Sequence, residues 1–207
     1  MARTRSPDFE QRQQTILTSA AALFAERGYS ETLLEDIAEH CGIKRSSIYH
    51  YHASKHALLH SLIAWKIEDL TQKVEQAVAG ADSPRDKLHA LVRALVEDYV
   101  RSPHEVTLLN TQTRHLNEAA LQSTAALQNR LIGHVRQLIQ ALRPDLQIPR
   151  QHHTALTMLL FGMVNWVHVW YKPRGSLTPE QLVELIIRLF LDGLLHQDAS
   201  SRGSPSL

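Results

Sequence analysis

The sequence predicts an all-α protein with a small N-terminal domain of three helices and a larger C-terminal domain of antiparallel helices. Apolar residues recur at helical spacing along most of the 207 residues. The eight glycines and eight prolines stand mostly between these periodic stretches, and no stretch shows the alternation of a strand. We expect the first domain at residues 1–53, the second at 54–197 and a disordered tail at 198–207.

Three helices are predicted in the first domain. The first runs from Phe9 to Arg27, and its apolar face holds Ile16, Ala20, Leu23 and Phe24. Gly28 follows at the position of a C-cap glycine. The second helix begins with a capping-box signature formed by Thr32 and Glu35. After a tight turn the third helix runs from about residue 44 to residue 50.

The second domain is predicted as long antiparallel helices separated by proline-containing breaks. One helix begins at Ser54, another follows Pro84 and a third ends at Pro144. The last two helices, at about 155–171 and 181–195, are apolar around most of their circumference. Such helices need burial on two sides, so we expect these two helices to form the interface of a homodimer.

Composition narrows the functional classes. The formal net charge of +1 does not by itself indicate a nucleic-acid partner. A single cysteine excludes an intrachain disulfide framework, and no leader or membrane-spanning run is visible, so a soluble cytoplasmic protein is expected. Phosphate-binding glycine loops, metalloprotease motifs and nucleophile elbows are also missing. We therefore expect neither an enzyme nor a bound cofactor.

Residues 40–60 contain three cations and no carboxylate. The two short helices before Ser54, joined by a turn with a glycine, form a helix-turn-helix, whose second helix enters the major groove of double-stranded DNA. Arg45 can donate a bidentate pair to guanine, while Ser46 and Ser47 are small enough for close approach. Lys55 adds an ammonium group at a helix N-terminus, where phosphates bind.

Other features of the first domain allow two interpretations each. His56 and His60 have the spacing of two zinc ligands on a helix, but a third ligand is missing nearby. Cys41 is either a small buried apolar residue or a redox-sensitive thiol. The N-terminal arm carries Arg3 and Arg5, which either reach the DNA minor groove or belong to a disordered end.

The second domain contains polar residues in apolar surroundings. Asn165 and His168 must find hydrogen-bond partners, because an unpaired buried polar group costs about 1–3 kcal/mol. One interpretation is an internal or dimer-interface hydrogen bond. The other is an effector pocket in which these residues face a polar segment of the middle helix. The predicted effector-binding residues are Asn110, Gln112, Arg114, Asn165, Trp166, His168 and Trp170.

The segment "LFAERGYSETLLEDIAEHCGIKRSSIYHYHASKHALL" resembles the N-terminal module of the TetR family of bacterial repressors, over roughly residues 9–60. The resemblance implies that Arg45, Ser46 and Ser47 face DNA bases. It further implies phosphate contacts by a second set of residues, namely Thr32, Tyr49, His50, Tyr51 and Lys55. His52 departs from the family pattern, because an apolar residue, often Phe, usually closes the small core there.

The later segment "FGMVNWVHVWYKPRGSLTPEQL" is similar to TetR-type regulators that sense acyl-CoA thioesters. That similarity implies an apolar slot and cations for the CoA phosphates, for which the candidates are Arg114, Arg130, Lys172 and Arg174. We expect a homodimeric repressor that binds a palindromic operator and is released by a small effector, such as an acyl-CoA. The alternative is an effector-independent DNA-binding or co-regulatory protein.

Overall fold

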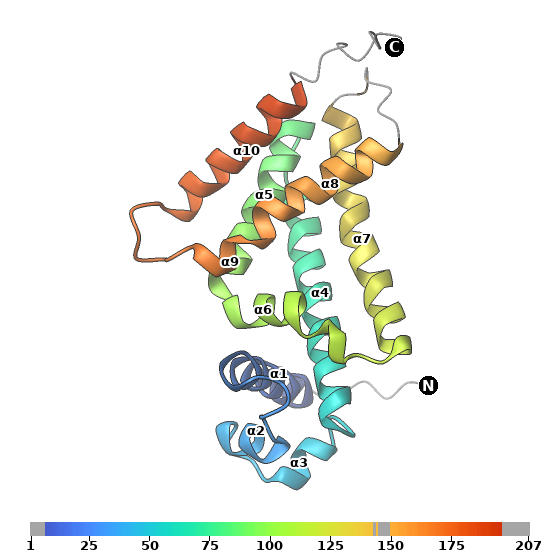
Figure 1. Cartoon of the computed structure of the whole chain (residues 1–207), viewed down its shortest axis with the longest axis vertical. Helices are drawn as coiled ribbons and strands as arrows, with labels where there is room; N and C mark the ends of the chain where they lie inside the picture. The colour runs from blue at the N-terminus through green and yellow to red at the C-terminus, as the bar shows by residue number, and fades with distance from the viewer. Residues whose placement is uncertain (1–6, 143, 145–149, 196–207) are drawn as a thin grey trace, which may run out of the picture. The chain divides into compact units, whose positions relative to one another are not determined.

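In a computed structural model of the protein, every regular element of the described residues is a helix, which confirms the predicted all-α class (Figure 1). The structure describes residues 7–142, 144 and 150–195. The predicted tail and the arm with Arg3 and Arg5 lie outside these ranges. None of the helices in the described ranges combines the length and apolarity that crossing a bilayer requires.

The helices follow one another with short connections. In chain order they are α1 (Pro7–Arg27), α2 (Leu34–His40), α3 (Arg45–Tyr49), α4 (Lys55–Ala79), α5 (Pro84–Arg101), α6 (Pro103–Thr111), the 3₁₀ helix η1 (Thr113–His115), α7 (Glu118–Leu142), α8 (Arg150–Asn165), α9 (Val167–Trp170) and α10 (Pro179–Leu195). The first three predicted helices are therefore present, with ends that differ from the expected ends by a few residues.

The chain forms two compact units. One contains residues 1–69 and 102–129, and the other contains residues 70–101 and 130–207. This division differs from the boundary expected at residue 53, because α6, η1 and the beginning of α7 belong to the unit of α1–α3. The expected boundary was based on function, and as a functional division it stays a prediction.

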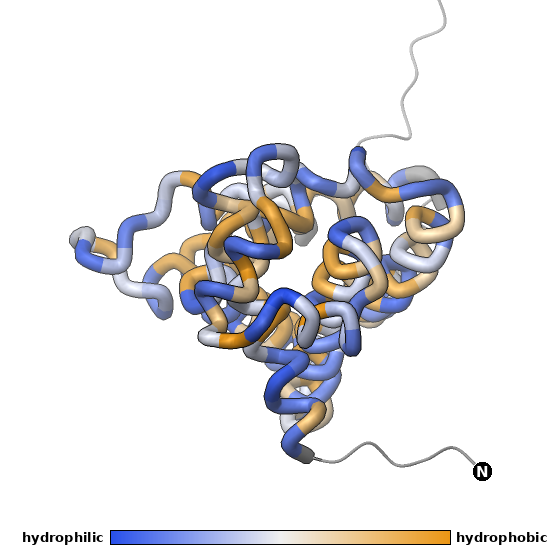
Figure 2. The backbone as a smooth tube through the Cα atoms, turned by 90° about the horizontal axis from the view of Figure 1, so that it is seen from below, coloured by the Kyte–Doolittle hydropathy of each residue, from blue (hydrophilic) through white to orange (hydrophobic). Residues whose placement is uncertain are grey.

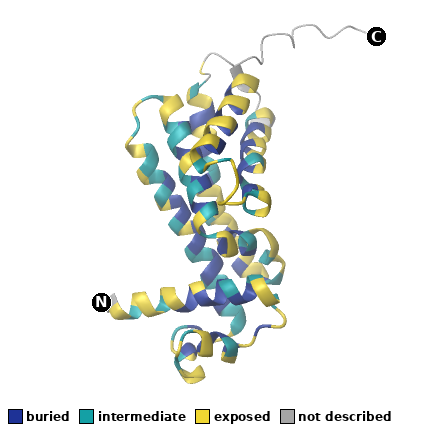
Figure 3. Ribbon diagram, turned by 90° about the vertical axis from the view of Figure 1, so that its left-hand side faces the viewer, coloured by how far each residue is buried: buried dark blue, intermediate teal, exposed yellow. Residues whose placement is uncertain are grey.

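The first unit has a core built around α1. Figure 3 shows that this helix is mostly exposed at its beginning and more buried further along. Its buried residues lie between Ile16 and Phe24, and the helix packs against α2 and α6. Phe24 is 1% exposed in this core. Gly28 ends the helix with a φ of +86°, which a side-chain-bearing residue rarely adopts. Gly42 has a φ of +66° in the turn that leads to α3, so the turns after α1 and α2 both depend on glycine.

The beginning of α2 corrects one local prediction. The N-cap residue is Leu33, and its backbone N–H donates to Asp36 Oδ2 at 2.7 Å. The capping pair is therefore shifted by one residue from the predicted pair of Thr32 and Glu35. Glu35 and Asp36 both lie in the first turn of α2. The conformation of the loop before α2 determines which of the two carboxylates accepts the hydrogen bond from the N-cap backbone N–H.

The second unit is organised around α5, which packs against α8, α9 and α10 (Figure 1). Hydrophobic and hydrophilic residues alternate along the backbone of the helices (Figure 2). The apolar face of α5, from Leu88 to Tyr99, is buried. Large apolar side chains nevertheless stay exposed on the last helices, namely Met158, Leu159, Trp166, Val169, Trp170, Leu185 and Leu189. The single chain thus covers one apolar side of these helices and leaves the other uncovered.

Candidate nucleic-acid interface

The surface of α3 combines one buried apolar residue with several exposed polar residues. Ile48 is fully buried and holds the helix on the core. Arg45, Ser46, Tyr49 and His50 are exposed around it. Four of the predicted DNA-contacting residues thus lie on one accessible surface, while Ser47 is half-buried.

Arg45 has two polar partners on that surface. Its Nη1 forms an ion pair with Glu35 Oε1 from α2 at 2.5 Å, and its Nη2 donates to the Tyr49 hydroxyl at 3.1 Å. The guanidinium carbon lies 5.7 Å from the centre of the Tyr49 ring. The hydrogen bond to Tyr49 and the charge of Glu35 raise the pKa of Arg45 above its usual value, so the group stays charged.

Lys55 is engaged differently from the prediction. Its Nζ donates to the carbonyl oxygens of Tyr29, Ser30 and Thr32, at 2.8, 3.1 and 2.9 Å. Its ammonium also lies 4.6 Å from the centre of the Tyr29 ring. An ammonium has three N–H donors, and all three are directed at the loop between α1 and α2. Lys55 thus has a structural role that the sequence did not predict, and its phosphate contact stays a prediction.

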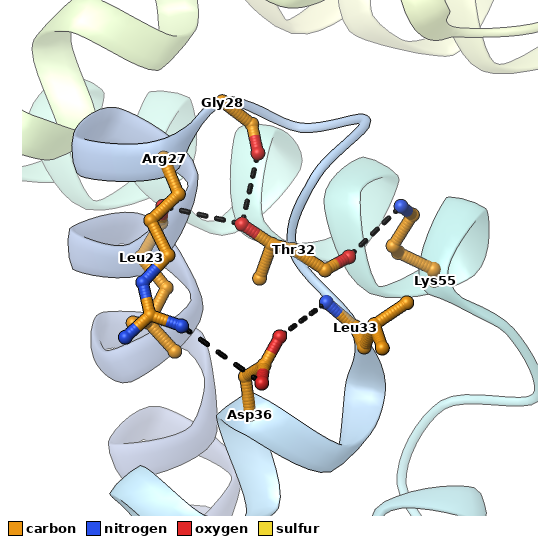
Figure 4. A network of polar contacts seen from close by, with 7 residues as sticks. All are labelled: Leu23, Arg27, Gly28, Thr32, Leu33, Asp36 and Lys55. Carbon is orange, nitrogen blue, oxygen red and sulfur yellow. Dashed lines mark hydrogen bonds and ion pairs between the residues drawn. The ribbon is translucent and has the colours of Figure 1, made fainter.

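Thr32 also supports the loop between α1 and α2. Its side chain is 0% exposed, and its hydroxyl is placed to donate to the carbonyls of Gly28 at 2.8 Å and Leu23 at 3.2 Å. Figure 4 shows how Thr32 joins the end of α1 to the beginning of α2. The Lys55 ammonium donates to the backbone carbonyl of Thr32. The buried hydroxyl thus fixes the loop, and the phosphate contact expected of Thr32 stays a prediction.

Tyr51 and His52 lie just after α3. Tyr51 is half-buried and stacks on Phe9, with ring centres 4.6 Å apart. It also lines a cleft of about 350 Å³ together with Arg12, Cys41 and other residues. His52 is 3% exposed, its Nε2 has no hydrogen-bond partner, and burial lowers its pKa to about 4. His52 is therefore a neutral core residue in this structure.

His60 and Cys41 each lie near a polar group of another helix. His60 Nε2 lies 2.9 Å from Ser123 Oγ, and Cys41 Sγ lies 4.0 Å from the carbonyl oxygen of Thr15. Among the described residues, no group of three or more His, Cys, Asp or Glu side chains is arranged to hold a metal ion.

The predicted effector residues of α8 and α9 form a helix junction. Asn165 Oδ1 accepts a hydrogen bond from the Tyr99 hydroxyl at 2.7 Å, and His168 Nδ1 lies 2.6 Å from the Asn165 carbonyl oxygen. The predicted continuous helix is interrupted here, at Trp166. Trp166 is 63% and Trp170 is 48% exposed, so these rings face solvent in the single chain. Their expected place in a pocket wall stays a prediction.

The predicted effector residues of the middle helix belong to the first compact unit. Asn110 and Arg114 are exposed, and Arg114 Nε donates to His115 Nε2 at 3.4 Å. Gln112 is different, because its Oε1 is buried without a hydrogen-bond partner. An unpaired buried acceptor is costly and is suited to a ligand that brings a donor. The sequence did not single out Gln112 from its neighbours.

Sequence reasoning also missed a cleft in the second unit. It has a volume of about 680 Å³ and lies between Arg85 of α5 and the Glu180–Arg188 part of α10, with Ser176 and Leu177 at its edge. His89 Nε2 and Glu184 Oε1 pair at 2.6 Å between these helices. None of the predicted effector residues lines it.

Comparisons with known proteins identify the family of the chain. Residues 16–62 match the family model described as "Bacterial regulatory proteins, tetR family", and residues 81–194 match "Tetracyclin repressor-like, C-terminal domain". The HTH-type transcriptional repressor KstR2 of Rhodococcus jostii (strain RHA1) is 29% identical over 188 residues, which cover 88% of this chain and 91% of that protein.

Solved structures show the same relationship. A TetR-family transcriptional regulator from Bordetella parapertussis 12822 superposes with a TM-score of 0.81 at 36% identity, covering 90% of this chain and 97% of that chain. AibR in complex with isovaleryl coenzyme A and operator DNA superposes with a TM-score of 0.75 at 26% identity, covering 86% and 97%. The chain is thus a DNA-binding transcriptional regulator and not an enzyme, and it belongs to the TetR family.

Proposed function

We propose that the protein is a homodimeric repressor that binds a palindromic operator through paired α3 helices and is released by a small apolar or amphipathic effector. The observation that carries the proposal is the surface of α3, where Arg45, Ser46, Tyr49 and His50 surround a fully buried Ile48. A buried anchor with polar and cationic neighbours matches a helix that reads base edges. A repressor of this kind acts in the bacterial cytoplasm, where its DNA lies.

The uncovered apolar side of α8–α10 supports the homodimer. Leu159 and Leu189 are 62% and 59% exposed, and Trp166 is 63% exposed. Several large apolar side chains exposed on neighbouring helices are typical of an interface. A two-fold interface would present two α3 helices to half-sites roughly 34 Å or a multiple apart, as a palindromic operator requires.

Release follows from a shift between two populations. An effector that binds better to a dimer with mismatched α3 spacing lowers operator affinity in proportion to that preference. A hundred-fold loss of operator affinity corresponds to about 2.7 kcal/mol of coupling.

An acyl-CoA thioester is the effector class that we propose. AibR was solved with isovaleryl coenzyme A. Each unit by itself offers exposed cations as candidates for binding the CoA phosphates, namely Arg114 in the first unit, and Lys172 and Arg174 in the second. Arg130 is a weaker candidate, since it forms a bidentate pair with Glu75. The buried acceptor of Gln112 is suited to an amide N–H of the pantetheine arm. No further cofactor is part of the proposal.

An effector-independent DNA-binding protein is the second candidate. Asn165 and His168 favour it, because both have partners inside the chain and need no ligand to satisfy them. A filled second domain would leave the helix-turn-helix unchanged.

Operator binding is tested by titrating the protein against its own upstream region and against random DNA. At about 150 mM salt non-specific contacts are weak, and the proposal expects a clear preference for the upstream region. Equal affinities would contradict it. A panel of acyl-CoA thioesters then separates the two candidates. An effector at about 100 times its dissociation constant stabilises the protein by roughly 2.7 kcal/mol and should dissociate the complex. If no ligand shifts the melting temperature, the effector-independent candidate is favoured.

A further inference from the structure

We propose that Glu35 is a specificity-determining residue, which with Tyr49 holds the Arg45 guanidinium in the orientation that reads a guanine. This inference rests on the proposed operator binding. The three residues come from two helices, since Glu35 lies in the first turn of α2 while Arg45 and Tyr49 lie one turn apart on α3. The turn at Gly42 brings the two helices together.

The geometry uses both ends of the guanidinium fork. Glu35 takes an N–H from Nη1, and the Tyr49 hydroxyl takes one from Nη2. A guanidinium has five N–H donors, so one N–H remains on each terminal nitrogen, together with the N–H on Nε. Two neighbouring N–H groups are what the O6 and N7 atoms of guanine require. Glu35 and Tyr49 therefore hold Arg45 without using up its reading capacity.

The ion pair is poorly suited to a purely stabilising role. The side chains of Arg45 and Glu35 are 56% and 47% exposed, and an exposed pair contributes little to folding. An arginine on a flexible stem, by contrast, loses rotamer freedom when it binds a base. A partner that restricts the side chain beforehand reduces that loss, so the pair acts on binding rather than on stability.

The charge of Glu35 adds a second effect. A carboxylate beside Arg45 reduces the local positive potential, which weakens attraction to phosphates of any sequence. Contacts with guanine retain their geometry, so affinity for the operator falls less than affinity for random DNA. Both effects raise the ratio of specific to non-specific affinity. Tyr49 keeps its own O–H for a phosphate contact.

The test is selection from a randomised double-stranded DNA library at about 150 mM salt, followed by affinity measurements on the selected duplex and on random DNA. The wild type should enrich a guanine that Arg45→Ala no longer selects. Glu35→Ala and Tyr49→Phe should keep the rest of the consensus and lose preference at that guanine. The ratio of specific to random affinity should fall about tenfold, within the range for one bidentate contact.

Glu39→Ala is the matched control, because Glu39 is exposed one turn further along α2. This variant loses the same charge and should select the wild-type consensus. Glu35→Ala should also make the affinity for random DNA more dependent on salt, by the amount of about one phosphate contact. The reason is that Arg45 then becomes available to the phosphates of the DNA backbone. Its melting temperature should match that of the wild type.

Three results would overturn the inference. Glu35→Ala can keep the guanine and bind all DNA more tightly, in which case Glu35 merely competes for Arg45. Arg45→Ala can still select the guanine, in which case Arg45 does not read this base. That result would leave the proposed operator binding intact. A wild type that enriches no sequence would instead remove the proposed function, and the inference with it.

Discussion

Lys55 shows how a residue's neighbours can give it a role that its position in the sequence does not predict. The sequence places it at a helix N-terminus near the DNA-reading helix, and the structure directs its three donors at carbonyls of residues 29–32. These carbonyls converge only after the loop has folded over α4. Spacing along the chain cannot predict such a contact, because it depends on backbone conformation more than twenty residues away.

Replacement of Lys55 by Met should therefore destabilise the fold. Hydrogen bonds to a charged group contribute about 1.5–3 kcal/mol, and we expect a loss of unfolding free energy in that range. Urea denaturation measures it. Lys55→Arg retains the charge, but its planar fork does not match three converging carbonyls, so partial loss is expected. If Lys55→Met leaves stability unchanged and abolishes DNA binding, the result would support a phosphate contact by Lys55 and contradict its structural role.

His52 makes stability depend on pH. Its pKa in the folded protein, about 4, lies below the ordinary value of 6.5 because burial disfavours the charged ring. Protonation therefore favours the unfolded chain, and the stability present above about pH 6.5 is lost as pH falls towards 4. At pH 5 the loss attributable to His52 should be about 2 kcal/mol.

Denaturation at about pH 7.5 and pH 5, on the wild type and on His52→Phe, isolates this contribution. Other groups titrate in both proteins, so the difference between the two pH dependences belongs to His52. Identical pH dependences would show that the folded protein tolerates a charged ring at this position.

At the scale of elements, sequence periodicity is a good guide where one apolar face decides the helix. The regular apolar face of α1 and the glycine after it are present as predicted. The break at Trp166 was missed, because the segment has no proline there and apolar residues continue on both sides. The Tyr99 hydroxyl, from another helix, binds Asn165 and accompanies the break, and such a tertiary contact leaves no periodic signal.

Tyr99→Phe should loosen the junction between α8 and α9. The hydroxyl is buried and its loss leaves Asn165 Oδ1 without its donor, so unfolding free energy should drop by about 1–2 kcal/mol. Thermal melting followed by circular dichroism measures the change. Tyr171→Phe is the control, since its hydroxyl bonds a loop carbonyl from a half-buried position and should matter less. Equal effects of both changes would contradict the special role of the junction.

At the scale of the whole molecule, the sequence identified the two helices that a single copy cannot cover. Helices that are apolar around most of their circumference predicted an interface, and some of their large apolar residues are exposed while others are buried. The interface itself stays a prediction. It did not predict the division into compact units, in which α6, η1 and the beginning of α7 join α1–α3. That division depends on packing between α1 and α6, which are far apart in the sequence. The apolar pattern of one helix does not specify which other helix packs against it.

A charge placed on the uncovered side should dissociate the dimer. Leu159→Glu and Leu189→Glu each bury a carboxylate if the proposed interface forms, and unpaired buried charges are strongly disfavoured. Analytical ultracentrifugation should show monomers, with weakened binding to a palindromic duplex. Gln140→Glu adds the same charge to an exposed position on α7 and should remain dimeric. Dimeric leucine variants would place the interface elsewhere.

The exposed indoles give the protein an optical signal of its own. Of the three tryptophans, Trp65 is partly buried against the core of the first unit, whereas Trp166 and Trp170 stand largely in solvent. A collisional quencher such as iodide therefore reports mainly on the α8–α9 junction. Any partner or ligand that covers this junction will shield two of the three fluorophores, so association can be followed on the unlabelled protein at submicromolar dilution.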